Sequence, residues 1–174
     1  PFPVEVGLFG KPTVVNNVET LINVLPIIQN TGEKYATWGT TGSRGKKLFC
    51  ISGAVNKAGV YEVTFGATLR ELIDLAGGLK TGSQLQAVLL GGAAGGFVGP
   101  QDLDLELTLE AARAAGTTLG SGVVMVLDQS VDMVDQLQRI AAFFRDESCG
   151  QCVPCRVGTV RQQEALARLV KSSG

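Results

Sequence analysis

The stretch KLFCISGAVNKAGVYEV, residues 47–63, decides how the middle of this 174-residue chain folds. Both of its ends are runs of β-branched and aromatic residues. Between them, Asn56-Lys57-Ala58-Gly59 supplies the residue types of a tight turn. Such a pattern predicts a β-hairpin.

The segment after the hairpin predicts a short helix. In Thr68-Leu69-Arg70-Glu71 the threonine and the glutamate stand three residues apart, which is the spacing of a reciprocal N-terminal cap. Apolar residues then recur at helical spacing for about eight residues, and Gly77-Gly78 can end the helix in the left-handed conformation. Further strands are predicted at 87–90 and 123–127. A hairpin, a short helix and further strands across residues 45–128 resemble a β-grasp (ubiquitin-like) domain.

The regions on either side of residues 45–128 differ from it in composition and in hydrophobic periodicity. Residues 1–44 are punctuated by proline and glycine and hold one short apolar segment, Val18 to Ile28, which Pro26 is expected to break. We expect this region to be the tail of a larger domain. Residues 129–174 switch to helical periodicity and predict two helices joined by a cysteine-rich connector. The predicted fold class is α+β, and we expect the chain to be a piece of a longer protein.

The composition excludes several classes of function. The chain has no histidine, which excludes a Ser-His-Asp or Cys-His hydrolase and a histidine-ligated zinc site within it. Its 15 Lys+Arg and 16 Asp+Glu give a formal net charge of −1, which argues against a nucleic-acid partner or a polybasic membrane contact. The longest uncharged stretch, Thr81 to Gln101, holds six glycines and is too polar for a membrane helix, so no direct membrane insertion is predicted.

Cys149, Cys152 and Cys155 form a C-x2-C-x2-C motif. Thiolates are soft anionic ligands, and this spacing lets one short loop offer three sulfurs to an iron–sulfur cluster. Arg156 follows the third cysteine, where its charge could offset that of the cluster and the thiolates. A structural zinc site and incidental thiols are the alternatives, whereas a disulfide framework is poorly supported without a secretory signal.

The fourth cysteine, Cys50, stands between Phe49 and Ile51 in a predicted strand. Free cysteine is among the most buried residue types, so we expect Cys50 to be a core thiol and not a ligand. A [4Fe–4S] cluster needs a fourth ligand, which we expect in sequence beyond Gly174.

Two motifs together resemble one protein family. Residues 147–156, ESCGQCVPCR, follow the β-grasp region, and the opening PFP at residues 1–3 is followed by GKPTVVNNVET at residues 10–20. This arrangement resembles the flavin-bearing NADH-oxidising subunit of respiratory complex I and the related diaphorase subunits of NAD-linked formate dehydrogenases and hydrogenases. The resemblance implies that residues 1–44 are the C-terminal part of an FMN/NADH-binding α/β domain. It also implies that 45–128 is a soluble-ligand-binding β-grasp domain and that 129–174 begins an iron–sulfur helical bundle with its first two helices.

The resemblance also implies roles for individual residues. Asn16, Asn17 and Thr20 would contact FMN, and Phe2 would stack on the adenine of NADH. The three motif cysteines would bind a [4Fe–4S] cluster, with Arg156 beside it. Without the resemblance, the two asparagines are typical of residues that cap the helix beginning near Val18, and Phe2 is an ordinary apolar residue.

Two further patterns suggest chemistry but have simpler explanations. The run Gly91-Gly92-Ala93-Ala94-Gly95-Gly96 fits neither common phosphate-loop motif and predicts a glycine-rich bend after a strand. Asp102, Asp104 and Glu106 alternate with leucines and predict an exposed strand face or loop rather than a metal site.

The function implied by the resemblance is electron input. The parent protein would oxidise NADH at FMN and pass single electrons to the cluster, within a multisubunit redox complex that includes a small iron–sulfur subunit. We expect a cytoplasmic location, peripheral to the membrane through partner subunits. Because the family's glycine-rich flavin loop and acidic NADH-facing residues lie upstream, the chain alone is expected not to oxidise NADH. The alternatives are a diaphorase subunit of a formate dehydrogenase or hydrogenase, and a zinc-binding or ligand-binding β-grasp module without a redox role.

Overall fold

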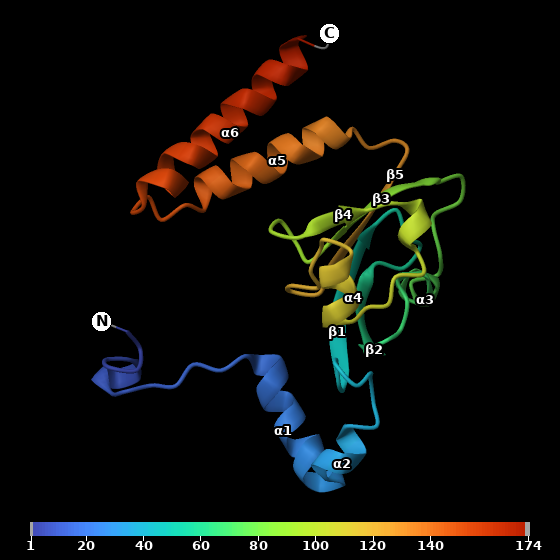
Figure 1. The fold of residues 1–174 in the computed structure, drawn as a ribbon, viewed down its shortest axis with the longest axis vertical. Helices are drawn as coiled ribbons and strands as arrows, with labels where there is room; N and C mark the ends of the chain where they lie inside the picture. Colours follow the sequence, from blue (N-terminus) through green and yellow to red (C-terminus); the bar gives the residue numbers. More distant parts are fainter. Residues whose placement is uncertain (1, 173–174) are drawn as a thin grey trace.

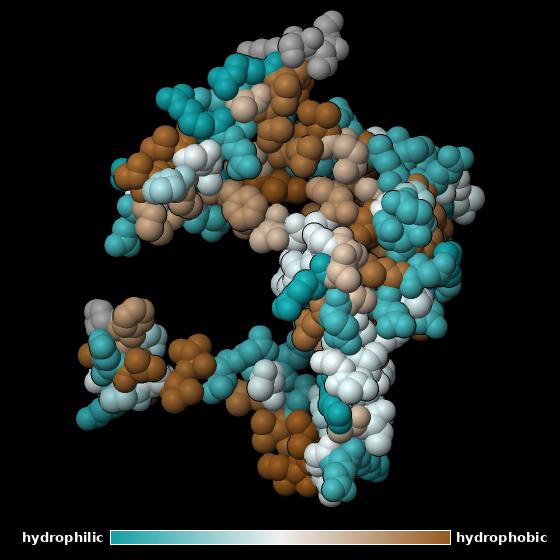
Figure 2. Space-filling view, viewed as in Figure 1, coloured by the Kyte–Doolittle hydropathy of each residue, from teal (hydrophilic) through white to brown (hydrophobic). Residues whose placement is uncertain are grey.

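Residues 2–172 are described by a computed structural model in which three parts follow one another along the chain (Figure 1). The first is an extended segment with the short 3-10 turn η1 (Leu8–Gly10), followed by helices α1 (Val18–Asn30) and α2 (Gly32–Tyr35). The second is a five-stranded sheet, and the third is a pair of long helices. The first and third parts project to the same side of the sheet, and Figure 2 shows a hollow between them.

The sheet has the strand order β2-β1-β5-β3-β4, and its central strand, β5, is parallel to β1. The predicted hairpin is present as an antiparallel pair of β1 and β2, in which Cys50 lies opposite Val60. Strand β3 runs antiparallel to both of its neighbours. This arrangement confirms the predicted α+β class and β-grasp fold. The strands are β1 (Lys46–Gly53), β2 (Gly59–Thr64), β3 (Leu85–Leu90), β4 (Gly96–Val98) and β5 (Val123–Asp128).

Helix α3 (Leu69–Leu75) begins and ends as its sequence predicts. The Thr68 hydroxyl accepts a hydrogen bond from the Glu71 N–H at 3.2 Å, and the Glu71 carboxylate accepts one from the Thr68 N–H at 2.7 Å. Gly77 and Gly78 follow with φ angles of 79° and 73°, which the missing Cβ permits. The helix buries its apolar face in one core, whose fully buried side chains include Phe49, Ile51, Leu69, Leu72, Val88, Leu90, Leu107, Val124 and Val126.

Three short elements differ from the prediction. Gly91–Gly96 forms the expected bend, but it joins β3 to the unpredicted strand β4. The acidic segment, expected as an exposed strand face or a loop, is a loop, and it begins in the unpredicted turn η2 (Pro100–Asp102). Helix α4 (Leu109–Ala114), capped by Thr108, was also not predicted. These elements span three to six residues, too few for hydrophobic periodicity to reveal them.

Helix α1 corrects the expectation that Pro26 breaks the apolar segment. The helix runs through Pro26 to Asn30, and the Asn30 side chain donates to the Pro26 carbonyl at 3.0 Å. A proline inside a helix removes one backbone hydrogen bond, and here the helix continues past that loss. Although α1 is rich in exposed apolar residues, no helix within residues 2–172 is long and apolar enough to cross a membrane.

Cys50 is exposed, so the expectation of a core thiol was wrong. Side chains alternate along a strand. In β1, Phe49 and Ile51 point into the core, each 1% exposed, and Cys50 points to the opposite face. The first of the two long helices, α5 (Met133–Asp146), packs on that face of the sheet. Its Ile140 and Phe143 line a cavity with residues of β3, β4 and β5 but not of β1.

Candidate iron–sulfur and flavin site

The three motif cysteines lie where α5 is joined to the second long helix, α6 (Val153–Ser172). Cys149 is in the connector, Cys152 directly precedes α6, and Cys155 is in its first turn. Pro154 suits this place because the first N–H groups of a helix have no partner within the helix. All three cysteines are free, exposed thiols. The amino-terminal end of a 20-residue helix carries partial positive charge, which favours anionic sulfur there.

Short-range contacts hold the connector in shape. The Arg156 guanidinium donates to the Gly150 carbonyl at 3.1 Å and ties the loop to the start of α6. Gly150 has a φ angle of 73°, and its N–H donates to the Ser148 hydroxyl at 3.3 Å. That hydroxyl also lies 3.4 Å from the Cys155 sulfur. The turn therefore depends on a glycine, and the arginine predicted to stand beside a cluster is directed at the loop backbone.

The donor set fits an iron–sulfur cluster by its chemistry. Three exposed thiols within seven residues, in the connector and the first turn of α6 and without a disulfide, supply the soft ligands that such clusters require. Across residues 2–172, however, no three cysteine, aspartate or glutamate side chains are gathered closely enough to hold one metal ion. Binding would therefore require the loop to bring its sulfurs together, and these three thiols leave one ligand position for a donor from elsewhere.

The segment expected to contact FMN forms the start of α1. Asn17 caps the helix, and its Oδ1 atom accepts from the N–H groups of Glu19 at 2.8 Å and Thr20 at 3.3 Å. The capping role that sequence chemistry alone favours is therefore present. Because Oδ1 is used by the cap, the group that Asn17 can offer a ligand is its amide N–H. Asn16 and Thr20 are exposed beside it.

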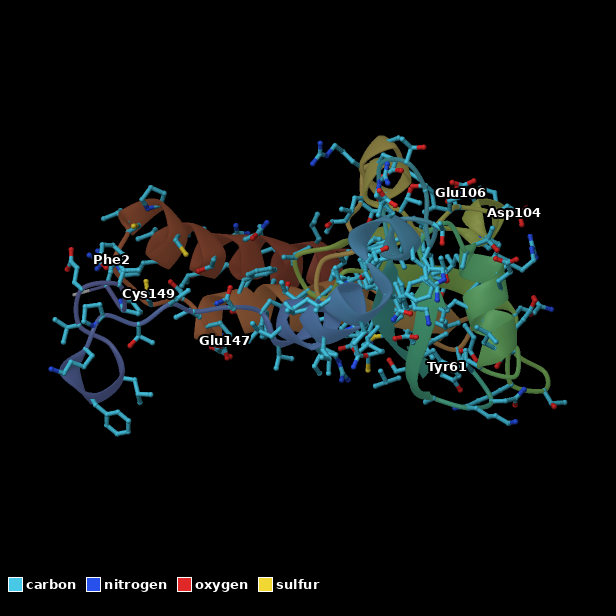
Figure 3. The ribbon with its side chains drawn as sticks, turned by 90° about the horizontal axis from the view of Figure 1, so that it is seen from below. Phe2, Tyr61, Asp104, Glu106, Glu147 and Cys149 are labelled. Atoms are coloured by element: carbon cyan, nitrogen blue, oxygen red, sulfur yellow. The ribbon has the colours of Figure 1, made fainter. Side chains whose placement is uncertain are left out.

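Phe2 lies in the extended amino-terminal segment and is 74% exposed. Its carbonyl accepts hydrogen bonds from the N–H groups of Glu5 and Val6, which fold the segment into a turn. In the view of Figure 3, Phe2 and Cys149 are both labelled at the end of the molecule away from the sheet. Figure 1 shows their segments on opposite sides of the hollow. The structure thus places Phe2 and the cysteine loop on one side of the molecule but not in contact.

A contact at Glu19, which the sequence did not reveal as functional, joins α1 to the sheet. Its carboxylate accepts a hydrogen bond from the Leu48 N–H at 2.8 Å and lies 3.4 Å from the Lys47 ammonium group. A cavity of about 290 Å³ beside this contact is lined partly by Asn17 and Thr20. The partners are separated by about thirty residues in sequence, so no local pattern predicts the contact.

The acidic trio is not a ligand set. Asp104 pairs with Arg70 at 2.8 Å, and the hydrogen bond and charge of this guanidinium lower the pKa of the carboxyl. Asp102 accepts from the Gly99 N–H within η2. Asp102 and Asp104 therefore have structural partners, and Asp104 and Glu106 lie in an exposed loop, as expected (Figure 3).

Comparison with known proteins gives two family matches. Residues 47–134 match the SLBB domain, and residues 135–174 match the NADH-ubiquinone oxidoreductase-F iron–sulfur binding region. The chain is 40% identical to the HndC component of the NADP-reducing hydrogenase of Solidesulfovibrio fructosivorans, over all of its own length and 36% of that protein's. It is also 40% identical to the F subunit of NADH-quinone oxidoreductase from Escherichia coli strain K12, over all of its length and 39% of the relative's.

The chain belongs to the SLBB domain family, and its homologues include F subunits of NADH-quinone oxidoreductases. A solved NAD+-reducing [NiFe]-hydrogenase, in its air-oxidised state, supports the same assignment. It matches with a TM-score of 0.83 and 37% identity over 98% of this chain and 29% of the hydrogenase chain. The resemblance stated from the sequence is thereby confirmed. The chain spans less than half the length of these two curated relatives, and its three motif cysteines fall inside the family's iron–sulfur binding region.

Proposed function

We propose that this chain is the flavin-to-cluster part of an electron-input subunit whose full-length form oxidises NADH. In such a subunit FMN takes the two electrons of NADH together, and the [4Fe–4S] cluster receives them one at a time. The observation that carries the proposal is the iron–sulfur region matched over residues 135–174, which contains a loop of three free thiols.

Each part of the chain has a task in this proposal. Cys149, Cys152 and Cys155 would supply three thiolate ligands of the cluster. Arg156 keeps the loop closed through the Gly150 carbonyl and adds positive charge near the anionic sulfurs. No side chain of this chain is needed as a general acid or base, because the cofactors supply the chemistry.

The start of α1 is proposed to hold FMN. Asn17 would donate its amide N–H to an acceptor on the flavin, while Asn16 and Thr20 offer further polar groups next to it. Phe2 is exposed and can stack on the adenine of NADH. We propose the domain limits 1–44, 45–128 and 129–174, so that the SLBB domain separates the flavin-contact segment from the cysteine loop.

The partner subunits determine which acceptor receives the electrons. We propose that it works in a multisubunit redox complex with a small iron–sulfur subunit, in the cytoplasm, and reaches the membrane only through partners. A hydrogenase diaphorase is the second candidate, favoured by the likeness to HndC and to the NAD+-reducing hydrogenase. Identifying the proteins that co-purify with the full-length protein separates the two.

Reduction by NADH tests the proposal. The full-length protein, purified without oxygen, should lose flavin absorbance when NADH is added and develop the electron paramagnetic resonance signal of a reduced cluster. A Cys152→Ser variant should still reduce its flavin but lack that signal. Residues 1–174 alone should show no NADH turnover. Full-length protein that NADH does not reduce would contradict the proposed function.

A further inference from the structure

Glu19 is held by contacts of its N–H, its carbonyl and its carboxylate, and it belongs to the motif that also contains Asn17 and Thr20. Its N–H donates to Asn17 Oδ1 at 2.8 Å. Its carbonyl accepts from the Asn23 side chain at 2.7 Å, and Asn23 in turn accepts from the Tyr35 hydroxyl at 3.1 Å. Its carboxylate leaves the helix and contacts β1. The backbone and the side chain of this one residue are therefore fixed by different parts of the chain.

The contact with β1 gives a hydrogen-bond partner to a backbone N–H that the sheet leaves unpaired. The Cys50 N–H donates to the Gly122 carbonyl on the β5 side, and N–H groups two residues apart along a strand point to the same side. The Leu48 N–H therefore also points toward the β5 side, but the pairing of β5 with β1 begins only at Cys50. Glu19 accepts this N–H at 2.8 Å. Without Glu19, Leu48 would lose that partner.

The second half of the contact is an ion pair that is shielded from solvent. Lys47 and Glu19 have side chains only 15% and 30% exposed, and their charged atoms lie 3.4 Å apart. By contrast, Lys46 and Glu62 form a shorter pair in the same sheet but are 37% and 55% exposed. Screening by water weakens the exposed pair more than the shielded one.

We propose that Glu19 is a positioning residue that fixes the start of α1, with Asn17 and Thr20, to the sheet of the SLBB domain. Glu19 lies between Asn17 and Thr20, so holding its carboxylate on β1 sets the direction of the Asn17 amide. Strand β1 pairs with β5, and β5 is followed by α5 and then by the cysteine loop. The start of α1 and the cysteine loop are therefore both connected to the same sheet. This inference rests on the proposed function, because it assumes that Asn17 and Thr20 face FMN.

The test measures flavin binding in the full-length protein. Glu19→Ala removes both interactions with β1, whereas Glu19→Gln keeps an oxygen acceptor for the Leu48 N–H and loses only the charge. We expect Glu19→Ala to raise the dissociation constant for FMN about tenfold and Glu19→Gln about threefold or less. The midpoint potential of the flavin should shift in Glu19→Ala, while iron content and thermal unfolding stay near the wild-type values.

Two further variants act as controls. Lys47→Met removes the ion pair and leaves the Leu48 hydrogen bond, so its effect on flavin binding should match that of Glu19→Gln. Glu62→Ala breaks the exposed pair with Lys46 and should leave flavin binding unchanged. Flavin binding in Glu19→Ala equal to wild type overturns the proposal. So does a Glu19→Ala protein that loses iron and flavin together and unfolds at a lower temperature, while Lys47→Met binds flavin normally.

Failure of the proposed function is distinguishable from failure of this inference. If the wild-type full-length protein binds no FMN, the proposed function and this inference both fall. If the wild type binds FMN and Glu19→Ala binds it equally well, only the positioning role is wrong.

Discussion

The Ser43 hydroxyl donates a 2.5 Å hydrogen bond to Oε2 of Glu110, which joins the loop before β1 to the first turn of α4. Ser43 is 2% exposed, and its oxygen also accepts from the Leu109 N–H at 2.9 Å. The Thr40 hydroxyl donates to the other carboxylate oxygen at 2.9 Å. One carboxylate thus anchors the connection between the amino-terminal helices and the SLBB domain.

This arrangement predicts a dependence of stability on pH. The hydrogen bond from Ser43, with that from Thr40, lowers the pKa of Glu110. A carboxyl whose pKa is lower in the folded state stabilises that state above its unfolded pKa of about 4.3, and the contribution is lost as the pH falls through the folded value. The Glu110→Gln variant should therefore lose less stability than the wild type when the pH falls below about 5. The unfolding temperature, measured as a function of pH, checks this.

Glu33→Gln, on exposed α2, is the control for the loss of a carboxylate. Its unfolding temperature should follow the wild-type pH profile. Identical pH profiles for wild type and Glu110→Gln would show that the anchor is not the cause.

The core beneath α3 predicts a difference between two leucines of one helix. Leu72 is fully buried, whereas Leu75 is 55% exposed. Leu72→Ala removes buried methyl groups and leaves a cavity, so it should lower the free energy of unfolding by about 2–5 kcal/mol. Leu75→Ala should change it by about 0.5 kcal/mol or less. Urea unfolding of the two variants measures both values, and equal losses would mean that α3 does not pack as described.

Local signals explain why much of the fold was predictable. The reciprocal cap of Thr68 and Glu71 and the glycine pair after α3 act within a few residues, and both are present in the structure. The predicted hairpin is present too, although Gly59 already belongs to β2 and pairs with Ile51, so the connection is longer than a tight turn at residues 56–59. Cys50 shows the limit of such signals. Whether the outer face of a strand is covered depends on where a distant helix packs, and α5 covers the neighbouring strands instead.

The candidate site was predictable to a similar degree. The motif spacing predicted the three cysteines as candidate ligands, and the asparagines before Val18 predicted a helix cap, because both signals are local patterns. The contact between Glu19 and Leu48 joins residues 29 positions apart, so only the folded chain reveals it.

Asn17 has two tasks that one substitution separates. Asp caps a helix about as well as Asn, so Asn17→Asp should keep α1 intact. It replaces the amide donor by a carboxylate, which cannot donate and repels a phosphate group, so flavin affinity in the full-length protein should fall about tenfold or more. Flavin fluorescence measures the affinity.

Gln29→Glu, an exposed change on the same helix, controls for added charge and should bind flavin as wild type does. Unchanged flavin affinity in Asn17→Asp would leave Asn17 with the capping role alone.

The assignment of the three thiols to an iron–sulfur cluster is tested most directly by iron and sulfide analysis of the full-length protein purified without oxygen. The matched variants are Cys152→Ser, in the loop, and Cys50→Ser, which changes another exposed thiol in a different element. Wild type and Cys50→Ser should carry the same iron and sulfide, with about four irons in the cluster held by this loop. Cys152→Ser should lose that share together with its visible absorbance. Zinc in place of iron, or full iron retention in Cys152→Ser, would contradict the assignment.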